Sequence, residues 1–401
     1  MALSYISLHM GKTEAYRRNV IPSHYSMKIF DLNSVNKHNK GSLFFLGYHL
    51  ASFQKRFLGL NIANRMQNLR WIVYIIMLLD PLFLAIEFIW LDIDPPDLSP
   101  LVSTRPLAML SLILFSSITS FIFLVTKSVS TDYTEIDEKC AALSLSTNEY
   151  FMNNFVPKKK FNRRLFTFIQ INLTIFSIIY VTLIMKINFL ALTWPDVFII
   201  CDAVLNWYRT VVIDEKIYDL IVSSILVRLS FESLSAEIYK RGDNEWTSEV
   251  LNMYREKYFK IIELTVAVNR IWTTFLGILY PLVPMLGVLF LYWFLIQPNH
   301  PVRIFFLISI SAAIFTVFHL ISRNLIAINV EAASIYDPIF RSTLLNKKTE
   351  YIVEAHVFLD RIGRNDIGLT MNNIFIINST SLASIITLVI TIVIAFPSFL
   401  S

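Results

Sequence analysis

Apolar runs long enough to cross a lipid bilayer constrain this chain more than any other feature of its sequence. A helix rises about 1.5 Å per residue, so the hydrocarbon core takes about 20 apolar residues to span. Such runs occur at 70–92, 106–126, 165–186, 193–213, 271–296, 303–322 and 373–396. Because 55% of the 401 residues are hydrophobic, a soluble domain of this length could not bury them all. The sequence predicts an all-α polytopic membrane protein with seven transmembrane helices.

The Lys and Arg residues lie almost entirely on one side of these spans. Thirty-one fall in the N-terminal segment and in the loops after the second, fourth and sixth spans, whereas the opposite side receives only Arg105, Lys186 and Arg303. Positively charged loops stay on the cytoplasmic side, so we expect a cytoplasmic N-terminus. This orientation is opposite to that of a G-protein-coupled receptor.

The topology divides the chain into alternating membrane and cytoplasmic parts. We expect a cytoplasmic segment at 1–69, with an interfacial helix near 43–60, because the apolar stretch there is too short to span. The predicted parts that follow are spans 1–2 at 70–126, a cytoplasmic loop at 127–164, spans 3–4 at 165–213, a cytoplasmic helical extension at 214–270, spans 5–6 at 271–322, a cytoplasmic helical segment at 323–372 and span 7 at 373–396.

The cytoplasmic connectors have helical periodicity of their own. The stretch 217–229 continues the fourth helix, and apolar residues recur at helical spacing in 250–270 and again before the last span. The residues that carry these two patterns are Leu251, Tyr254, Tyr258 and Ile261, then Ala355, Phe358, Leu359 and Ile362. The pattern predicts a cytoplasmic bundle, either a simple helical hairpin between spans or an oligomerisation platform.

A row of hydroxyl groups marks the last span. Thr380, Ser384, Thr387 and Thr391 are spaced four, three and four residues apart, which places them on one helix face. Such a row can line a hydrated path and replace part of an ion's hydration shell, with weak discrimination between ions. The alternative is that the hydroxyls bond carbonyls of their own helix or of a neighbouring helix.

Ionisable residues inside spans are costly and therefore point to function or to a specific partner. Those within or near the predicted spans are Asp80, Glu87, Asp202, Arg209 and His319. Asp80 or Asp202 could bind the substrate or coupling ion of a secondary transporter, and this is one hypothesis for the function of the chain. We expect Glu87 and Arg209 to reach the interfaces and His319 to be packed or hydrogen-bonded.

Enzymatic chemistry has no support in the sequence. It contains no Gly-rich phosphate loop, no metal-spaced His/Glu pair and no nucleophile elbow. The basic residues form topology signals with no single cluster suited to nucleic acid. We expect a non-enzyme without cofactor, metal or nucleic-acid partner.

The end of the chain resembles that of insect gustatory receptors. From Arg361 it reads RIGRNDIGLTMNNIFIINSTSLASIITLVITIVIAF, with a small residue, a Phe-x-x-Asp/Asn-like element and a long final helix. The family closes on Thr-Tyr, five apolar residues and Gln-Phe. Here Phe396 matches, whereas Leu388 and Val389 replace Thr-Tyr and Ala395 replaces Gln.

The resemblance implies the fold of insect odorant and gustatory receptors and a function in taste. In that family four subunits form a ligand-gated cation channel, with the last helix around the pore and the cytoplasmic helix extensions between subunits. It implies a homo- or heterotetramer with related subunits in the plasma membrane, and Thr380, Ser384, Thr387 and Thr391 as pore lining. A small-molecule pocket in the outer half would involve Ser111, Phe115, Tyr180, Trp194, Phe198, Tyr292 and Phe305. The lost closing positions leave a non-conducting protein of the same fold, with an adaptor or intracellular role, as the alternative.

Overall fold

A computed structural model describes residues 116–126, 133–179, 194–241, 245–296, 301–345 and 348–395. The chain divides into two compact units, Met1–Ser42 and Leu43–Ser401, and all described residues belong to the second. The interfacial helix expected near 43–60 and the first span at 70–92 lie outside the described residues.

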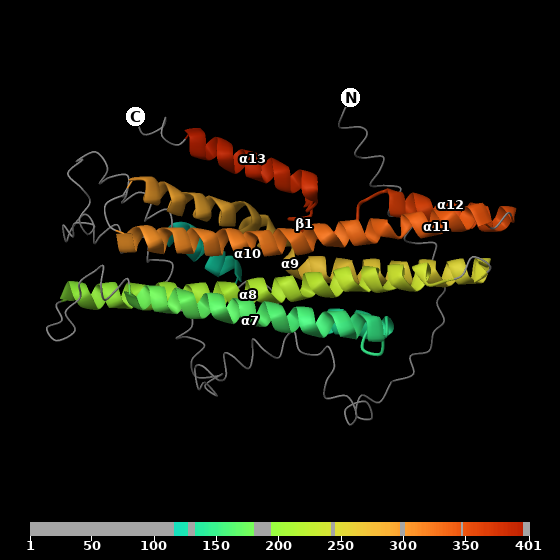
Figure 1. Ribbon diagram of the computed structural model, residues 1–401, viewed down its shortest axis with the longest axis horizontal. Helices are drawn as coiled ribbons and strands as arrows, with labels where there is room; N and C mark the ends of the chain where they lie inside the picture. The colour runs from blue at the N-terminus through green and yellow to red at the C-terminus, as the bar shows by residue number, and fades with distance from the viewer. Residues whose placement is uncertain are drawn as a thin grey trace, which may run out of the picture. The chain divides into compact units, whose positions relative to one another are not determined.

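The described elements are helices and one small hairpin (Figure 1). In chain order they are the helix Ser116–Thr126, α6 (Thr134–Ala142), α7 (Glu149–Ile179), α8 (Trp194–Tyr239), α9 (Ser248–Ile296), α10 (Pro301–Ser334), α11 (Tyr336–Leu345), α12 (Thr349–Gly363), β1 (Thr370–Met371), β2 (Phe375–Ile376) and α13 (Ser379–Ala395). The two strands pair antiparallel, with Thr370 opposite Ile376.

The central helices are much longer than a bilayer requires. α8 has 46 residues and α9 has 49, so each is about 70 Å long, against about 30 Å for the hydrocarbon core. α8 passes through 217–229 without a break, as the sequence predicted. Both helices must therefore extend well beyond any membrane that they cross.

Two of the described helices are long and apolar enough to cross a membrane, judged by length and composition alone. They are Ser248–Val288 and Ile308–Leu345, which contain most of the fifth and sixth predicted spans. Shorter apolar helices, Ser116–Thr126 and Ser379–Leu388, lie within the second and seventh predicted spans.

The core of the bundle forms where α9 packs against α8, α10 and α12. All eight residues of the two predicted helical patterns, from Leu251 to Ile261 and from Ala355 to Ile362, are buried there. Tyr258 of α9 lies at the centre. Its ring meets Phe231 of α8 edge-on at 5.6 Å and Phe358 of α12 at 5.3 Å, while its hydroxyl donates to the Ala332 carbonyl of α10 at 3.4 Å. One side chain thus connects four helices.

The last helix begins later than the sequence predicted. We expected a span from 373, whereas residues 370–376 form the β1–β2 hairpin and α13 starts at Ser379. Asn378 caps α13 reciprocally: the Ser381 N–H donates to Asn378 Oδ1 and the Asn378 N–H donates to Ser381 Oγ, both at 2.9 Å. Asparagine at this position satisfies free N–H groups of the first turn and so fixes the start of the helix.

Replacing Phe358 by Ala should lower the free energy of unfolding by about 3–5 kcal/mol, because it leaves a cavity against Tyr258. The adjacent Val357 is 59% exposed, so Val357→Ala should change that free energy by less than about 0.5 kcal/mol. Denaturant titration of the detergent-purified protein compares the two. Equal destabilisation would contradict the central place of Phe358.

Candidate functional site

The hydroxyl row lies on the exposed surface of α13. Thr380, Ser384, Thr387 and Thr391 are all exposed in the single chain. Three of the hydroxyls donate to carbonyls one turn back: Ser384 to Thr380 at 3.1 Å, Thr387 to Ala383 at 2.9 Å and Thr391 to Thr387 at 2.8 Å. This is the own-carbonyl arrangement that the sequence left open.

The backbone bonds leave the lone pairs of these hydroxyl oxygens facing away from the helix. A hydroxyl has one O–H donor and two acceptor lone pairs. Because the donor is used on the helix backbone, the oxygen of each bonded hydroxyl presents lone pairs away from it. A row of such oxygens suits a cation or water better than an anion.

Most of α13 is not covered by its own chain. Its contacts are made to α9 near its start, where Leu382 and Ile385 pack against the core. Further along, Ile386, Leu388 and Ile390 are each between 43% and 56% exposed. An apolar helix with this much free surface needs lipid or another subunit around it.

The hairpin before α13 turns through two asparagines. Asn372 and Asn373 have φ of 50° and 57°, and the Ile374 N–H donates to the Met371 carbonyl at 2.9 Å. Positive φ at both central residues is the type I′ geometry, which Asn tolerates better than other residues with a side chain. The pair Asn-Asn between short apolar stretches was the sequence signal for this turn, and sequence reasoning missed it.

Side chains of α9 hold the hairpin by its backbone. Asn269 Oδ1 accepts from the Thr370 N–H at 2.7 Å, and Thr273 Oγ1 accepts from the Asn373 N–H at 2.9 Å. The Asn372 N–H donates to the Thr273 carbonyl at 3.1 Å. Nothing in the periodicity of α9 singled out Asn269 or Thr273. We call this set of contacts between α9 and residues 370–373 the hairpin joint.

A missing side chain lets the two elements approach. A Cβ at Gly277 of α9 would lie 2.4 Å from Nδ2 of Asn372. Only the glycine surface leaves room for the asparagine in its present position. The hairpin joint thus combines hydrogen bonds with close packing of the Asn372 side chain against the α9 backbone at Gly277.

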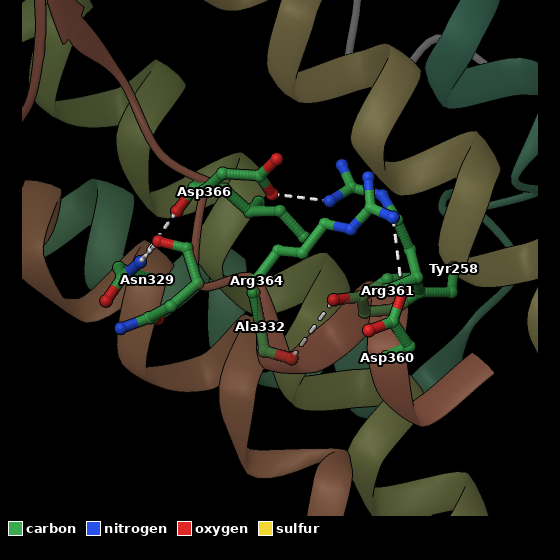
Figure 2. Close-up of polar contacts among 9 residues, drawn as sticks. Tyr258, Asn329, Ala332, Asp360, Arg361, Arg364 and Asp366 are labelled. Atoms are coloured by element: carbon green, nitrogen blue, oxygen red, sulfur yellow. Dashed lines mark hydrogen bonds and ion pairs between the residues drawn. The ribbon is translucent and has the colours of Figure 1, made fainter. Parts of the chain in front are cut away.

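The segment between α12 and the hairpin is fixed to α10 (Figure 2). Asn329 of α10 donates to the Asn365 carbonyl at 3.2 Å and to the Ile367 carbonyl at 3.0 Å. Arg361, near the end of α12, pairs with Asp366 across the same turn. Both long helices that run into the predicted fifth and sixth spans therefore hold the chain just before α13.

A buried charged cluster lies on α8 directly after the predicted fourth span. Glu215 accepts two bonds from Arg163 of α7, at 2.9 and 2.8 Å. The neighbouring Asp214 is 7% exposed, and its Oδ2 has no hydrogen-bond partner among the described residues. Burial, helped by the negative charge of Glu215, raises the pKa of Asp214 to about 7.

The proposed pocket residues are not described at the level of side chains. Ser111, Phe115 and Tyr180 lie outside the described residues. Trp194, Phe198, Tyr292 and Phe305 belong to the helices α8, α9 and α10, but their side chains lie outside the described part. The structure does not test this set.

The ionisable residues of the spans have different outcomes. Arg209 is buried and donates to Ser120 Oγ of the helix Ser116–Thr126, and its place at a membrane interface stays a prediction. His319 is exposed, against the expectation of a packed residue. Asp80, Glu87 and the Asp202 side chain lie outside the described part. Among the described residues, no group of three or more His, Cys, Asp or Glu could hold a metal ion.

Comparison with solved structures identifies the fold. The chain resembles the insect olfactory receptor OR5 from Machilis hrabei with a TM-score of 0.54 and 13% identity, over 83% of this chain and 89% of that one. The same receptor in complex with eugenol gives 0.52 and 13%, over 81% and 88%. No protein-family model and no curated protein sequence matches the chain. The all-α fold of the insect odorant and gustatory receptors, predicted from the end of the sequence, is confirmed.

Replacing Asn269 by Leu should destabilise the hairpin joint by about 1–3 kcal/mol, because the Thr370 N–H loses its acceptor. Asn252→Leu on the same helix is the control, since Asn252 Oδ1 has no hydrogen-bond partner among the described residues. Limited proteolysis between α12 and α13 reads out the joint. Cleavage at the same rate in both variants would show that Asn269 does not hold the hairpin.

The buried carboxyl predicts a pH dependence. The folded protein holds the Asp214 proton more tightly than the unfolded chain, in which Asp titrates near pH 4. Its contribution to stability is therefore complete below about pH 4 and is lost as pH rises to about 7. Asp214→Asn should become more stable relative to wild type across this window, as measured by denaturant titration at a series of pH values. A pH-independent difference in unfolding free energy for Asp214→Asn would contradict this.

Proposed function

We propose that this chain is a gustatory-receptor-like chemoreceptor that acts as a ligand-gated cation channel in the plasma membrane. Four subunits, identical or related, would place α13 around a central pore. The fold supports this proposal, since the solved structures that share it are olfactory receptors, one of them in complex with the small molecule eugenol.

The observation that carries the proposal is the exposed hydroxyl row of α13. Thr380, Ser384, Thr387 and Thr391 lie along a helix that its own chain leaves largely uncovered. Three of these hydroxyls donate their hydrogen to backbone carbonyls, so their oxygens can only accept hydrogen bonds or bind cations on the outer side of the helix. Partial replacement of a hydration shell by such oxygens, without a formal charge, would pass cations with weak discrimination.

Ligand control would reach α13 through the hairpin joint. The pocket residues implied by the resemblance belong in part to α8, α9 and α10. The hairpin joint connects α9 to the start of α13, and Asn329 connects α10 to Ile367 just before the hairpin. A ligand that favours one arrangement of these helices would shift α13 by its differential affinity for the two states. Direct hydrogen bonds join α9 to the hairpin, so a movement of α9 would be transmitted to the start of α13.

A non-conducting protein of the same fold is the second candidate. The observation that favours it is the sequence at the end of α13, where Leu388, Val389 and Ala395 stand in place of the family's Thr-Tyr and Gln. In this case the hydroxyl row would serve only to bond the helix backbone.

Ser384→Leu or Thr387→Leu should reduce ligand-evoked current at least tenfold, because a bulky apolar group would replace an oxygen facing the pore. Ser379→Leu makes the same kind of change at an exposed position on another face of α13, about 120° around the helix from the row, and is the matched control. Surface labelling must show equal delivery of all three variants. Unchanged current in Ser384→Leu and Thr387→Leu would contradict the pore assignment. Absence of current from wild type across a ligand panel, with folded protein at the surface, would favour the non-conducting candidate.

A further inference from the structure

The five basic residues in the sequence KKKFNRR of α7 fall into three groups by their surroundings. Lys158 lies 3.7 Å from Glu232, and Arg163 binds Glu215, so both turn toward acidic residues of α8. Lys159 is half-buried and lies 5.9 Å from the Phe155 ring. Lys160 and Arg164 are exposed, and neither makes an ion pair with any described residue.

The two outward residues lie on one stripe of the helix. They are four residues apart, so one stands above the other on the same face. The stripe continues toward the end of α7 as Phe168, Ile171, Ile175 and Ile178, which are all 49–64% exposed. Phe161 beside the two cations is 63% exposed as well. The outer face of α7 thus changes from apolar to cationic within one turn.

That change coincides with the predicted membrane boundary. The third span was predicted from 165, and an apolar stripe of this exposure is what lipid chains cover. Along the helix axis, Arg164 lies about 6 Å and Lys160 about 12 Å below the first lipid-facing residue, Phe168, so both reach the depth of the cytoplasmic headgroups. Anionic headgroups of this leaflet attract basic side chains next to a spanning helix.

We propose that Lys160 and Arg164 form a binding site for an anionic phospholipid of the cytoplasmic leaflet. The headgroup phosphate is held by the two cations, with the Arg164 guanidinium able to form two parallel bonds to it. The acyl chains lie along Phe168 and Ile171. Phe161 lies between the two cations along the chain, at the headgroup level where aromatic side chains are favoured. The inference depends on the membrane placement of the chain and not on ion conduction.

The test titrates phosphatidylserine or phosphatidylcholine into the detergent-purified full chain and follows bound lipid by native mass spectrometry. Wild type should bind phosphatidylserine more tightly than phosphatidylcholine. Lys160→Gln with Arg164→Gln should weaken phosphatidylserine binding about thirtyfold, about fivefold for each basic side chain near the headgroups. The matched control is Lys240→Gln with Arg341→Gln, which removes the same charge at exposed positions away from the stripe and should leave binding unchanged.

Three outcomes would overturn the proposal. They are equal affinity of wild type for the two lipids, equal loss in the two double variants, and a smaller oligomer for Lys160→Gln/Arg164→Gln with unchanged lipid binding. The last result would assign this face to contact between subunits. Because bound lipid is measured without any current, a protein that binds phosphatidylserine as predicted but never conducts would uphold this inference while the channel proposal fails.

Discussion

The arrangement of the last helix depends on the hairpin joint, the set of contacts between α9 and the β1–β2 hairpin. Asn269 and Thr273 bind backbone N–H groups of the hairpin, and Gly277 leaves space for Asn372. The cap at Asn378 then starts α13 at a defined position. The joint, together with the packing of Leu382 and Ile385 against the core, places the hydroxyl row relative to the bundle.

The bundle and the last helix differ in how much of their apolar surface the chain itself buries. In the bundle, apolar side chains at helical spacing fill the space around Tyr258, and the buried Glu215 is paired with Arg163. α13 instead leaves both its hydroxyls and several large apolar side chains uncovered. Free surface of this kind on an apolar helix is explained by an environment of lipid and neighbouring subunits. The exposed apolar residues on the outer face of α7 are explained in the same way, by contact with lipid.

Periodicity was enough to predict the long helices and much of the core. The spacing of Leu251, Tyr254, Tyr258 and Ile261 marked the buried face of α9 correctly, and the fold followed from the resemblance at the end of the chain. Hydropathy could not place the start of α13, because Ile374, Phe375 and Ile376 are as apolar as a helix requires. The turn at Asn372-Asn373 decides that boundary through backbone conformation. Nor could it find Asn269, whose role depends on a hairpin about 100 residues away. The pocket residues remain a prediction.

Single-particle imaging of the detergent-purified protein at side-chain resolution tests the central claim most directly. The account predicts a fourfold particle with α13 of each subunit around the axis, and with Ser384 and Thr387 facing that axis. A monomer, or a tetramer in which Ile386, Leu388 or Ile390 closes the axis whether or not ligand is bound, would contradict it.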